Sequence, residues 1–355
     1  MTSKAATSGR LHLLDGMRGL AAFAVIVDHV PSDLLRTLLP GRHLAVDFFF
    51  VLSGLVLAKA YNASLSQPGG IARFLKLRLI RLYPMYALGL IIGIAVMLYP
   101  VLRGAGGFDN TLMPISIVAG ILFLPSPATL NQPYDVLFPF DPPAWSLFFE
   151  VVANTVWVFL SFTFRGRFRF ALLILFVLWA GISVYFAPVS GAGWQWAHFN
   201  TGLAKVCFSF FTGVALHALM SRYALSRIPV ILPLALLAFI LMWPAGEQMR
   251  PVFDVVAMIA IIPVTVMLAA HAPVQGLAAR TSDWLGAVSY GVYILHVPLF
   301  LMLEPAFAHL GIPATLQAII LAVSAALFTQ LAISIYETPL QRALKAALVP
   351  KRTSA

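Results

Sequence analysis

Charged residues and cysteines are scarce in this sequence, and each shortage excludes a class of protein. Asp, Glu, Lys and Arg make up 10% of the 355 residues, whereas ordinary globular chains carry about 25%. Because 61% of the residues are hydrophobic, no soluble domain of useful size remains. The single cysteine, Cys207, excludes an intrachain disulfide and leaves no thiolate cluster for a metal. The histidines show no metal-binding spacing, so no metal site is predicted.

The sequence does contain apolar runs of about 20 residues, the length that a helix needs to cross a bilayer. They predict an all-α integral membrane protein, a bundle of about ten transmembrane helices. The first residues, MTSKAATSGR, are too few and too polar for a cleaved signal peptide, so the first run is expected to be a span. The predicted spans are Leu13–Val30, Leu44–Tyr61, Leu82–Leu102, Trp145–Phe164, Phe170–Ala187, Leu203–Met220, Ile228–Trp243, Pro251–Ala270, Gly286–Leu303 and Ala314–Tyr336.

An eleventh apolar segment, Met113–Leu124, has Pro at both ends and is shorter than a spanning helix needs to be. If it does not cross, every basic link falls on one side of the membrane, including Arg73–Arg81 and Arg165–Arg169. The positive-inside rule then places both termini in the cytoplasm. We therefore predict one domain over residues 1–355, with short cytoplasmic tails at 1–10 and 340–355. The net charge of +10 fits topology and anionic lipid better than nucleic acid.

The first span, LDGMRGLAAFAVIVDHVP, differs from a plain anchor because it carries Arg18 and His29. In a helix these residues share a face and lie about 16 Å apart along the axis. A cation and a histidine are costly when they face lipid, so both are expected to face a cavity or polar partners.

The predicted topology sorts other polar residues by depth. Arg78 and Arg81 close a cytoplasmic link on the side of Arg18, whereas Asp47 opens the second span from outside. Trp145, Ser146 and Glu150 open the fourth span from outside, and His29 belongs with this outer group or in the middle of the membrane. A basic inner cluster and an acidic outer one suit a substrate with an anionic head inside and a reactive end held deeper.

Simpler structural roles compete with these assignments. Arg78 and Arg81 at span ends could snorkel to the membrane surface, and Trp145 could belong to an interfacial belt. His296 could bond to a neighbouring helix. Glu150 lies about one turn into its span, where a carboxylate needs a partner or a cavity.

Six motifs occur in a characteristic order along the chain. They are LDGMRGLAAFAVIVDH, VDFFFVLSG, RLIRLYP, PAWSLFFE, LGAVSYGVYILH and YETP. With them the chain resembles the acyltransferase family 3 membrane proteins, which move acyl groups, commonly acetyl, onto bacterial surface and secreted carbohydrates. One motif departs from the family, which commonly reads SVEEQFY after WSL where this chain has FFEVVAN. The chain resembles the short members without a hydrolase-like domain, which act on exopolysaccharide, O-antigen or lipid-linked glycan units.

The resemblance implies a multi-pass protein of the bacterial inner membrane that takes its acyl group from cytoplasmic acyl-CoA, with no permanently bound cofactor. It assigns catalysis to His29 and the donor site to Arg18, Arg78 and Arg81. Trp145, Ser146, Tyr290 and His296 are expected to contact substrate. The expected partners are acyl-CoA, a glycan acceptor, the lipid bilayer and proteins of polysaccharide assembly.

The chemistry agrees with that assignment. Acyl transfer to a sugar hydroxyl needs a base with a pKa near 7, and imidazole is the natural candidate. A carboxylate can hold the imidazole in the correct tautomer, and we expect Glu150 or Asp47 in that role before Asp28. Arginine is the better bidentate partner for the phosphates of CoA. Direct transfer and an acyl-histidine intermediate both remain open.

A transporter of a carbohydrate or lipid-linked intermediate is the alternative, since buried Arg, His and Glu could bind substrate or relay protons. The sequence shows no inverted repeat, and a transporter gives no reason for a basic cluster confined to one side.

Overall fold

The computed structural model describes residues 11–65, 67–103, 112–129, 135–163, 167–186, 193–222 and 227–349. The structure is 82% helical, and the described residues contain no strand, only an isolated bridge between Val136 and Gln195. The predicted all-α class is therefore confirmed. The predicted tail 1–10 lies outside the described residues. Within the predicted tail 340–355, the described part is helical to Leu348.

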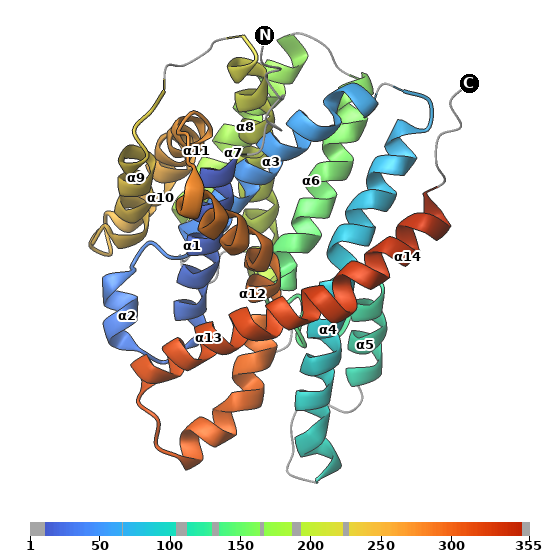
Figure 1. The fold of residues 1–355 in the computed structure, drawn as a ribbon, viewed down its shortest axis with the longest axis vertical. Coiled ribbons are helices and arrows are strands. Elements are labelled where there is room, and N and C mark those ends of the chain that lie inside the picture. The colour runs from blue at the N-terminus through green and yellow to red at the C-terminus, as the bar shows by residue number, and fades with distance from the viewer. Residues whose placement is uncertain are drawn as a thin grey trace.

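The helices follow one another as a bundle with one oblique pair across it (Figure 1). They are α1 (His12–His29), α2 (Asp33–Leu38), α3 (Leu44–Leu65), α4 (Gly70–Leu102), α5 (Met113–Ile121), α6 (Ala144–Thr163), α7 (Arg167–Phe186), α8 (Phe199–Met220), α9 (Ile231–Met242), α10 (Arg250–Val256), α11 (Ile262–Ala270), α12 (Gly276–His309), α13 (Ala314–Ala332) and α14 (Thr338–Leu348). Short 3-10 turns lie at Pro127–Thr129 and Trp196–His198.

Among the described residues, six helical stretches are long and apolar enough to cross a membrane: Leu44–Asn62, Gly70–Pro100, Trp196–Met220, Arg250–Ala270, Gly276–His309 and Ala314–Leu348. Shorter apolar stretches occur in α6, α7 and α9. The count of ten spans and the cytoplasmic location of the termini stay predictions. The Met113–Leu124 segment contains α5, whose nine residues are too few to cross the hydrocarbon core.

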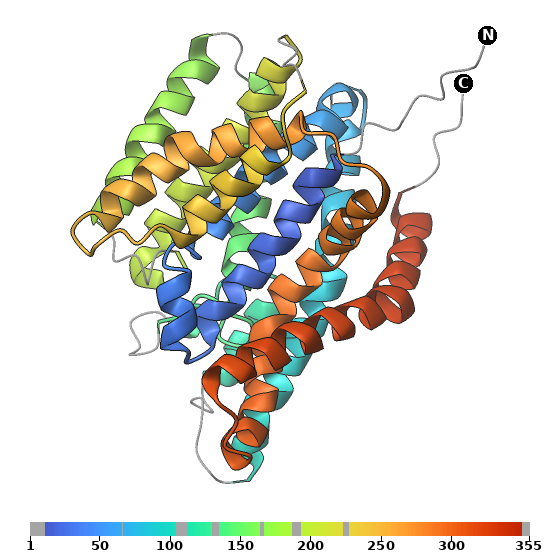
Figure 2. The same ribbon diagram turned by 60° about the vertical axis from the view of Figure 1, so that its left-hand side comes forward.

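α1 and α12 lie side by side, as the blue and orange helices in Figure 2 show. They pack closely because glycines line their contact. A side chain at Gly16 would meet Ser282, one at Gly19 would meet Leu285, and one at Gly286 would meet Asp15. Small residues let helix backbones approach closely in membrane proteins. This contact fixes the first span against the helix that carries His296.

α3 and α8 cross in the same way. A Cβ at Gly54 would meet the carbonyl oxygen of Phe210, and one at Gly213 would meet that of Val51. The crossing holds Asp47 of α3 beside Lys205 of α8.

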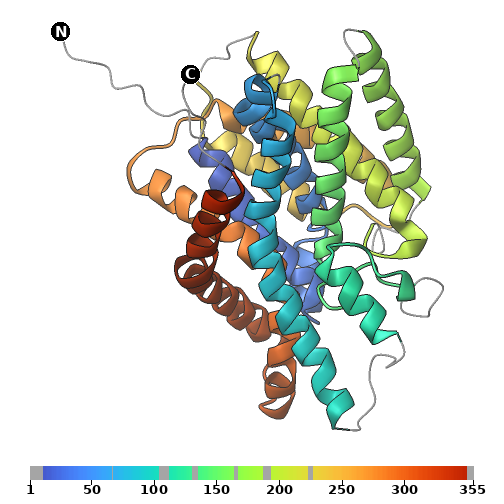
Figure 3. The ribbon, with the colours of Figure 1, turned by 90° about the vertical axis from the view of Figure 1, so that its right-hand side faces the viewer.

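α13 and α14 run obliquely across α12 and α4 (Figure 1), and α4 stands between this pair and α6 in Figure 3. A π-helical turn, Ile333–Glu337, joins α13 to α14, and a second one, Ala257–Ile261, joins α10 to α11. Each turn ends two residues before a proline, Pro339 or Pro263. Proline lacks the N–H of a regular helix and clashes with the preceding turn, so the helix widens there.

Candidate active site

The structure brings Arg18, Arg78 and Arg81 to the lining of one cavity, here named the arginine cavity, with a volume of about 160 Å³. Arg18 comes from α1, and the two others lie one turn apart on α4. Its polar lining is completed by Ser53, Ser146, Glu150, Ser289, Tyr290 and Tyr293. Three cations from two helices therefore surround one small space.

Arg78 is bound by Glu150 of α6, which pairs with its guanidinium. The hydroxyl of Ser53 donates to the same Glu150 oxygen at 2.5 Å. The side chains of both ion-pair partners are mostly buried, so each charge offsets the cost of burying the other. This contact links α3, α4 and α6.

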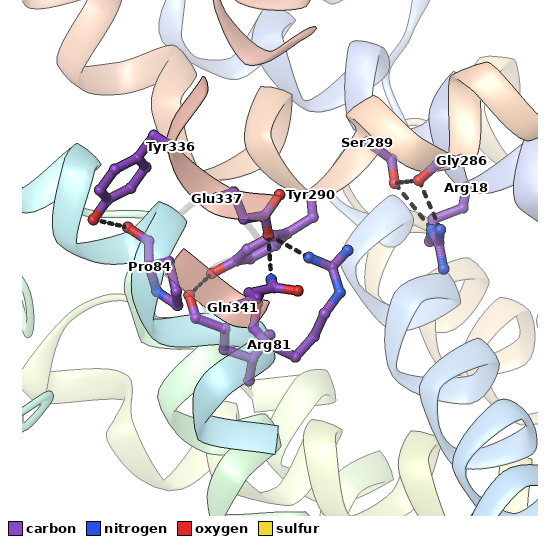
Figure 4. A network of polar contacts seen from close by, with 10 residues as sticks. Arg18, Arg81, Pro84, Gly286, Ser289, Tyr290, Tyr336, Glu337 and Gln341 are labelled. Carbon is purple, nitrogen blue, oxygen red and sulfur yellow. Dashed lines mark hydrogen bonds and ion pairs between the residues drawn. The ribbon is translucent and has the colours of Figure 1, made fainter. Parts of the chain in front are cut away.

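Arg81 reaches Glu337 in the π-helical turn between α13 and α14, with 2.5 Å between Nη1 and Oε1 (Figure 4). Its guanidinium lies 5.3 Å from the centre of the Tyr290 ring, a cation–π distance. The Tyr290 hydroxyl donates to the carbonyl oxygen of Leu82 at 2.5 Å, and Gln341 also donates to Glu337, at 2.9 Å. The face of the Tyr290 ring thus packs against the Arg81 guanidinium.

Arg18 is held against α12 (Figure 4). Its Nε donates to the hydroxyl of Ser289 at 2.9 Å, and its Nη2 donates to the carbonyl oxygen of Gly286 at 2.7 Å. Asp15, one turn earlier on α1, lies 3.2 Å from the same Nη2.

A second and larger cavity, here named the histidine cavity, has a volume of about 770 Å³. His29, at the end of α1, lines it together with the indole rings of Trp145 and Trp194. The other ionisable residues of its lining are Asp28, Arg36, Arg42, His43 and Lys205.

The charges around the histidine cavity are largely paired. Asp28 accepts from Arg42 at 2.5 Å, and the ammonium of Lys205 lies 3.1 Å from the fully buried carboxylate of Asp47. His43 contacts Asp254 at 2.8 Å. Asp47 therefore lies behind the cavity, as the counter-ion of a buried lysine.

His29 contacts a second imidazole. Its Nδ1 lies 3.0 Å from Nε2 of His296, and the Nδ1 of His296 lies 2.7 Å from the carbonyl oxygen of Tyr293. His296 is fully buried, and it is absent from the lining of both cavities.

Val46 and Tyr293 line both cavities and are named here the dividing wall. The hydroxyls of Tyr293 and Ser146 lie 2.8 Å apart, which ties α12 to α6 at the wall. The arginine cavity thus meets the histidine cavity across two side chains.

A family model that covers most of the chain identifies its family. The family model described as an acyltransferase domain, the third acyltransferase family, matches residues 11–336. The chain belongs to acyltransferase family 3. A curated relative, "Protein 2 in picA locus" from Rhizobium radiobacter, is 39% identical over 160 residues, which cover 42% of this chain and 81% of the relative. No solved structure matches the chain.

Membership of acyltransferase family 3 makes this protein a membrane acyltransferase with several apolar helices. Neither comparison points to transport. Among the described residues, no group of three or more His, Cys, Asp or Glu side chains is placed to hold a metal ion.

The predicted site residues of this acyltransferase fall into two cavities, and this division differs from the inner and outer groups expected from the sequence. Glu150 and Ser146 line the arginine cavity, although the topology placed them with the outer group. Trp145, their neighbour in sequence, lines the histidine cavity. One helical turn at the start of α6 therefore faces both cavities.

Among the residues that the structure describes, neither Glu150 nor Asp47 is the partner of His29. Glu150 contacts Arg78 and Ser53, and Asp47 contacts Lys205; His296 takes the position beside His29. A buried arginine and a buried lysine attract these carboxylates more strongly than a neutral imidazole does.

Tyr293 and Ser289 are among the site residues that were missed from the sequence. The signal that would have found them is helical spacing, because Ser289, Tyr293 and His296 stand at positions i, i+4 and i+7 of SYGVYILH. Residues at this spacing share one face of a helix. Lys205 could not be recognised in the same way, because its partner lies on another helix.

Proposed function

We propose that this protein moves an acyl group, acetyl in the first instance, from cytoplasmic acyl-CoA to a hydroxyl of an exopolysaccharide, O-antigen or lipid-linked glycan unit. The observation that carries the proposal is the pair of cavities meeting at Tyr293, with three arginines in one and His29 in the other. The protein would reside in the bacterial inner membrane and work beside other proteins of polysaccharide assembly.

Donor binding is assigned to the arginine cavity. CoA carries several phosphate charges, and guanidinium groups bind phosphate oxygens with two parallel hydrogen bonds. Arg78 and Arg81 each have N–H groups beyond those bonded to Glu150 and Glu337, and Arg18 adds a third guanidinium to the lining. The basic links between spans support a cytoplasmic location of this cavity under the positive-inside rule, on the side where acyl-CoA is found.

Acceptor binding is assigned to the histidine cavity. Its volume of about 770 Å³ lies in the usual range of roughly 300–1,000 Å³ for small-molecule sites. Trp145 and Trp194 provide flat apolar faces for sugar rings, and Gly193, at φ 105°, leaves room for the Trp145 ring. Arg36 and Arg42 in its lining can bind acidic groups of a glycan.

The reaction takes place at the dividing wall. The pantetheine arm of CoA carries the thioester past Tyr293 toward His29, about 16 Å along α1 from Arg18. The acceptor hydroxyl gives its proton to the free nitrogen of His29 while its oxygen bonds to the thioester carbon. The carbon–sulfur bond then breaks, and the leaving thiolate takes the proton back from His29. General base catalysis of this kind typically contributes about 10²- to 10⁴-fold.

The experiment uses the purified protein in liposomes, with acetyl-CoA labelled in the acetyl group and an exopolysaccharide deacetylated by mild alkali. We expect CoA thiol to be released in step with alkali-labile label in the polysaccharide, and the His29→Ala protein to give neither. Unchanged acetyl-CoA together with movement of glycan across the liposome membrane would instead support a transporter.

A further inference from the structure

His296 and His29 form a hydrogen-bonded chain whose direction is fixed at one end. The Nδ1 of His296 lies 2.7 Å from the carbonyl oxygen of Tyr293, within the same helix. A carbonyl oxygen can only accept, so the hydrogen of this bond belongs to Nδ1.

The charge of His296 follows from its surroundings. Its side chain is fully buried, and none of the ion pairs of the described residues includes it. A buried imidazolium without a counter-ion is costly, so His296 is neutral. A neutral imidazole has one N–H, and the Nε2 of His296 therefore carries a lone pair.

The tautomer of His29 follows in turn. Its Nδ1 lies 3.0 Å from that lone pair, so the hydrogen between the two rings is on Nδ1 of His29. The Nε2 of His29 is then unprotonated in the resting protein. This is the nitrogen a general base needs free.

We propose that His296 is a positioning residue that holds His29 in its Nδ1–H tautomer and so makes Nε2 the basic atom. This proposal rests on the proposed function, in which His29 accepts the hydroxyl proton. His296 takes the place that a carboxylate holds in a catalytic triad, which Glu150 and Asp47 leave empty here because both are bound to cations.

The helix packing keeps the two rings in register. The ring centres lie 4.7 Å apart at an interplanar angle of 70°, and nearer the start of α1 the contact with α12 is closed by Gly16, Gly19 and Gly286. His296 is also anchored by its own helix through Tyr293, three residues earlier. Neither ring can turn without breaking a bond to the other or to the backbone.

A neutral partner changes the chemistry relative to a carboxylate. When His29 takes the hydroxyl proton, it becomes an imidazolium. His296 continues to accept its Nδ1–H hydrogen bond, but it supplies no negative charge to stabilise the cation. The charged groups nearest to it, Asp28 with its partner Arg42, and Arg36, supply the remaining field. His29 therefore returns the proton readily to the leaving thiolate.

The test reads the tautomers directly. The protein is labelled with ¹³C,¹⁵N-histidine in liposomes, and the ring signals of His29 and His296 are assigned by their loss in His29→Asn and His296→Phe. We expect both rings of the wild-type protein to show the Nδ1–H pattern. In His296→Phe, which keeps a ring but offers no acceptor, the backbone of Val25 remains a hydrogen-bond partner of His29, so the Nε2–H pattern should gain at the expense of the Nδ1–H pattern.

Turnover gives the second readout. His296→Phe should lower turnover about 10- to 100-fold, because the wrong tautomer removes the base, with the KM for acetyl-CoA unchanged. His296→Gln, whose amide oxygen can accept from His29, should stay within about tenfold of wild type. His271→Phe is the matched control, since the Nδ1 of His271 also bonds to a carbonyl of its own helix, Met267, at 2.9 Å.

An Nε2–H pattern for His29 in the wild-type protein would overturn the proposal, as would equal turnover in His296→Phe and His271→Phe. The NMR signals do not depend on turnover, so they test the tautomer even if His296→Phe fails to fold. An Nδ1–H signal in a protein whose His29→Ala variant remains fully active would reject the proposed function and leave the tautomer standing.

Discussion

The arginines around the arginine cavity are all held by neighbouring acceptors. Glu150 pairs with Arg78, Glu337 with Arg81 and Asp15 with Arg18. These contacts fix the guanidinium groups in place before a ligand arrives, which lowers the entropy cost of binding. They also mean that phosphate must bind beside a carboxylate or displace it.

Replacing an arginine of the cavity by alanine should weaken binding of CoA about 10- to 100-fold, the worth of a charged hydrogen bond. Lysine should restore only part of the affinity, because it lacks the planar fork. Calorimetric titration with CoA measures the effect for Arg18, Arg78 and Arg81 in turn.

Because these arginines are ion-paired, the control variant must also neutralise the partner carboxylate. Arg78→Ala alone strands a buried carboxylate, which destabilises a protein by about 3–5 kcal/mol. The comparison is therefore between Glu150→Gln and the double variant Arg78→Ala/Glu150→Gln, which have the same neutral residue at position 150. Equal CoA affinity in these two, and in the corresponding pair at Arg81 and Glu337, would remove the donor site from this cavity.

His29 is the side chain on which the proposed catalysis depends. His29→Ala should lower glycan acylation by at least about 10²-fold, while CoA affinity stays near wild type because the phosphate contacts lie in the other cavity. Turnover of the wild type should rise with pH as the imidazole loses its proton, since only the neutral ring accepts one. Stopped assays with labelled acetyl-CoA between pH 5 and 8 measure this, and a folded His29→Ala protein with normal turnover would contradict it.

Asp141, in the segment before α6, is fully buried, and neither carboxylate oxygen has a hydrogen-bond partner among the described residues. Burial raises the pKa of this carboxyl well above its usual value. The folded protein therefore holds a proton that the unfolded chain has lost above about pH 4, so stability falls as pH rises.

Asp141→Asn should remove this dependence and raise the thermal midpoint at neutral pH, with the gain shrinking toward pH 4. Thermal unfolding in detergent across that range measures it. Asp135→Asn is the control, because the Asp135 carboxylate already accepts from Gln195 at 2.8 Å and from the Ala197 N–H at 3.1 Å. A lower midpoint for Asp141→Asn than for wild type at neutral pH would contradict the burial argument.

Among the helices, α3 and α8 have the closest backbone approach described above, at Gly54 and Gly213. The crossing sets the positions of Ser53, beside Glu150, and of Asp47, beside Lys205. A change in the distance between these two helices would therefore shift side chains at both cavities.

Gly54→Ala should force α3 away from α8 and destabilise the protein by about 1–3 kcal/mol, the usual cost of overpacking. Gly246→Ala is the control, since no atom lies within 4 Å of the added Cβ. Thermal unfolding of both variants in one detergent measures the difference. Equal midpoints would show that the crossing tolerates a methyl group.

The helices were largely predictable because hydrophobicity alone specifies them. Residues 44–61 and 203–220 were predicted as spans, and α3 and α8 contain them. The sequence did not predict that α4 begins at Gly70 and α12 at Gly276. The added turns carry charges such as Arg73 and Arg280, which a search for apolar runs excludes. The pairing of α1 with α12 depends on glycines far apart in sequence, and periodicity says nothing of such contacts.

The site was predictable in its parts and not in its pairings. Motif residues such as Arg18, Arg78 and Arg81 were recognised as a group, and they line one cavity. The partners of Arg78 and Arg81, Glu150 and Glu337, come from elements far away in the sequence, whereas Asp15 pairs with Arg18 within α1. Which acid pairs with which base depends on how each helix is rotated and tilted. A single sequence does not specify these angles.

On the scale of the whole molecule, the beginning of α1 and the end of α14 lie toward the same end in Figures 2 and 3. The side chain of Lys76, near the beginning of α4, reaches the carbonyl oxygen of Leu348 at 3.3 Å. The predicted cytoplasmic link before the third span and the last helix therefore meet on one face.

The predicted orientation can be tested with single cysteines in a Cys207→Ser background. Ser221→Cys, after α8, should be protected from a membrane-impermeant thiol reagent in intact cells, whereas Gly246→Cys, between α9 and α10, should be labelled. The reason is the excess of Lys and Arg on the side of Ser221. Permeabilised cells serve as the control, where both positions should react, and the reverse pattern in intact cells would place the termini outside.

The dividing wall also bears on the membrane that surrounds it. Polar cavities that approach each other from opposite faces shorten the distance over which a bilayer holds back protons and ions. Tyr293, whose hydroxyl lies 2.8 Å from that of Ser146, lines both cavities and separates them together with Val46. Under the proposed function, a tethered acyl chain would have to pass this wall without opening a path along which the electrochemical gradient of the cell is lost.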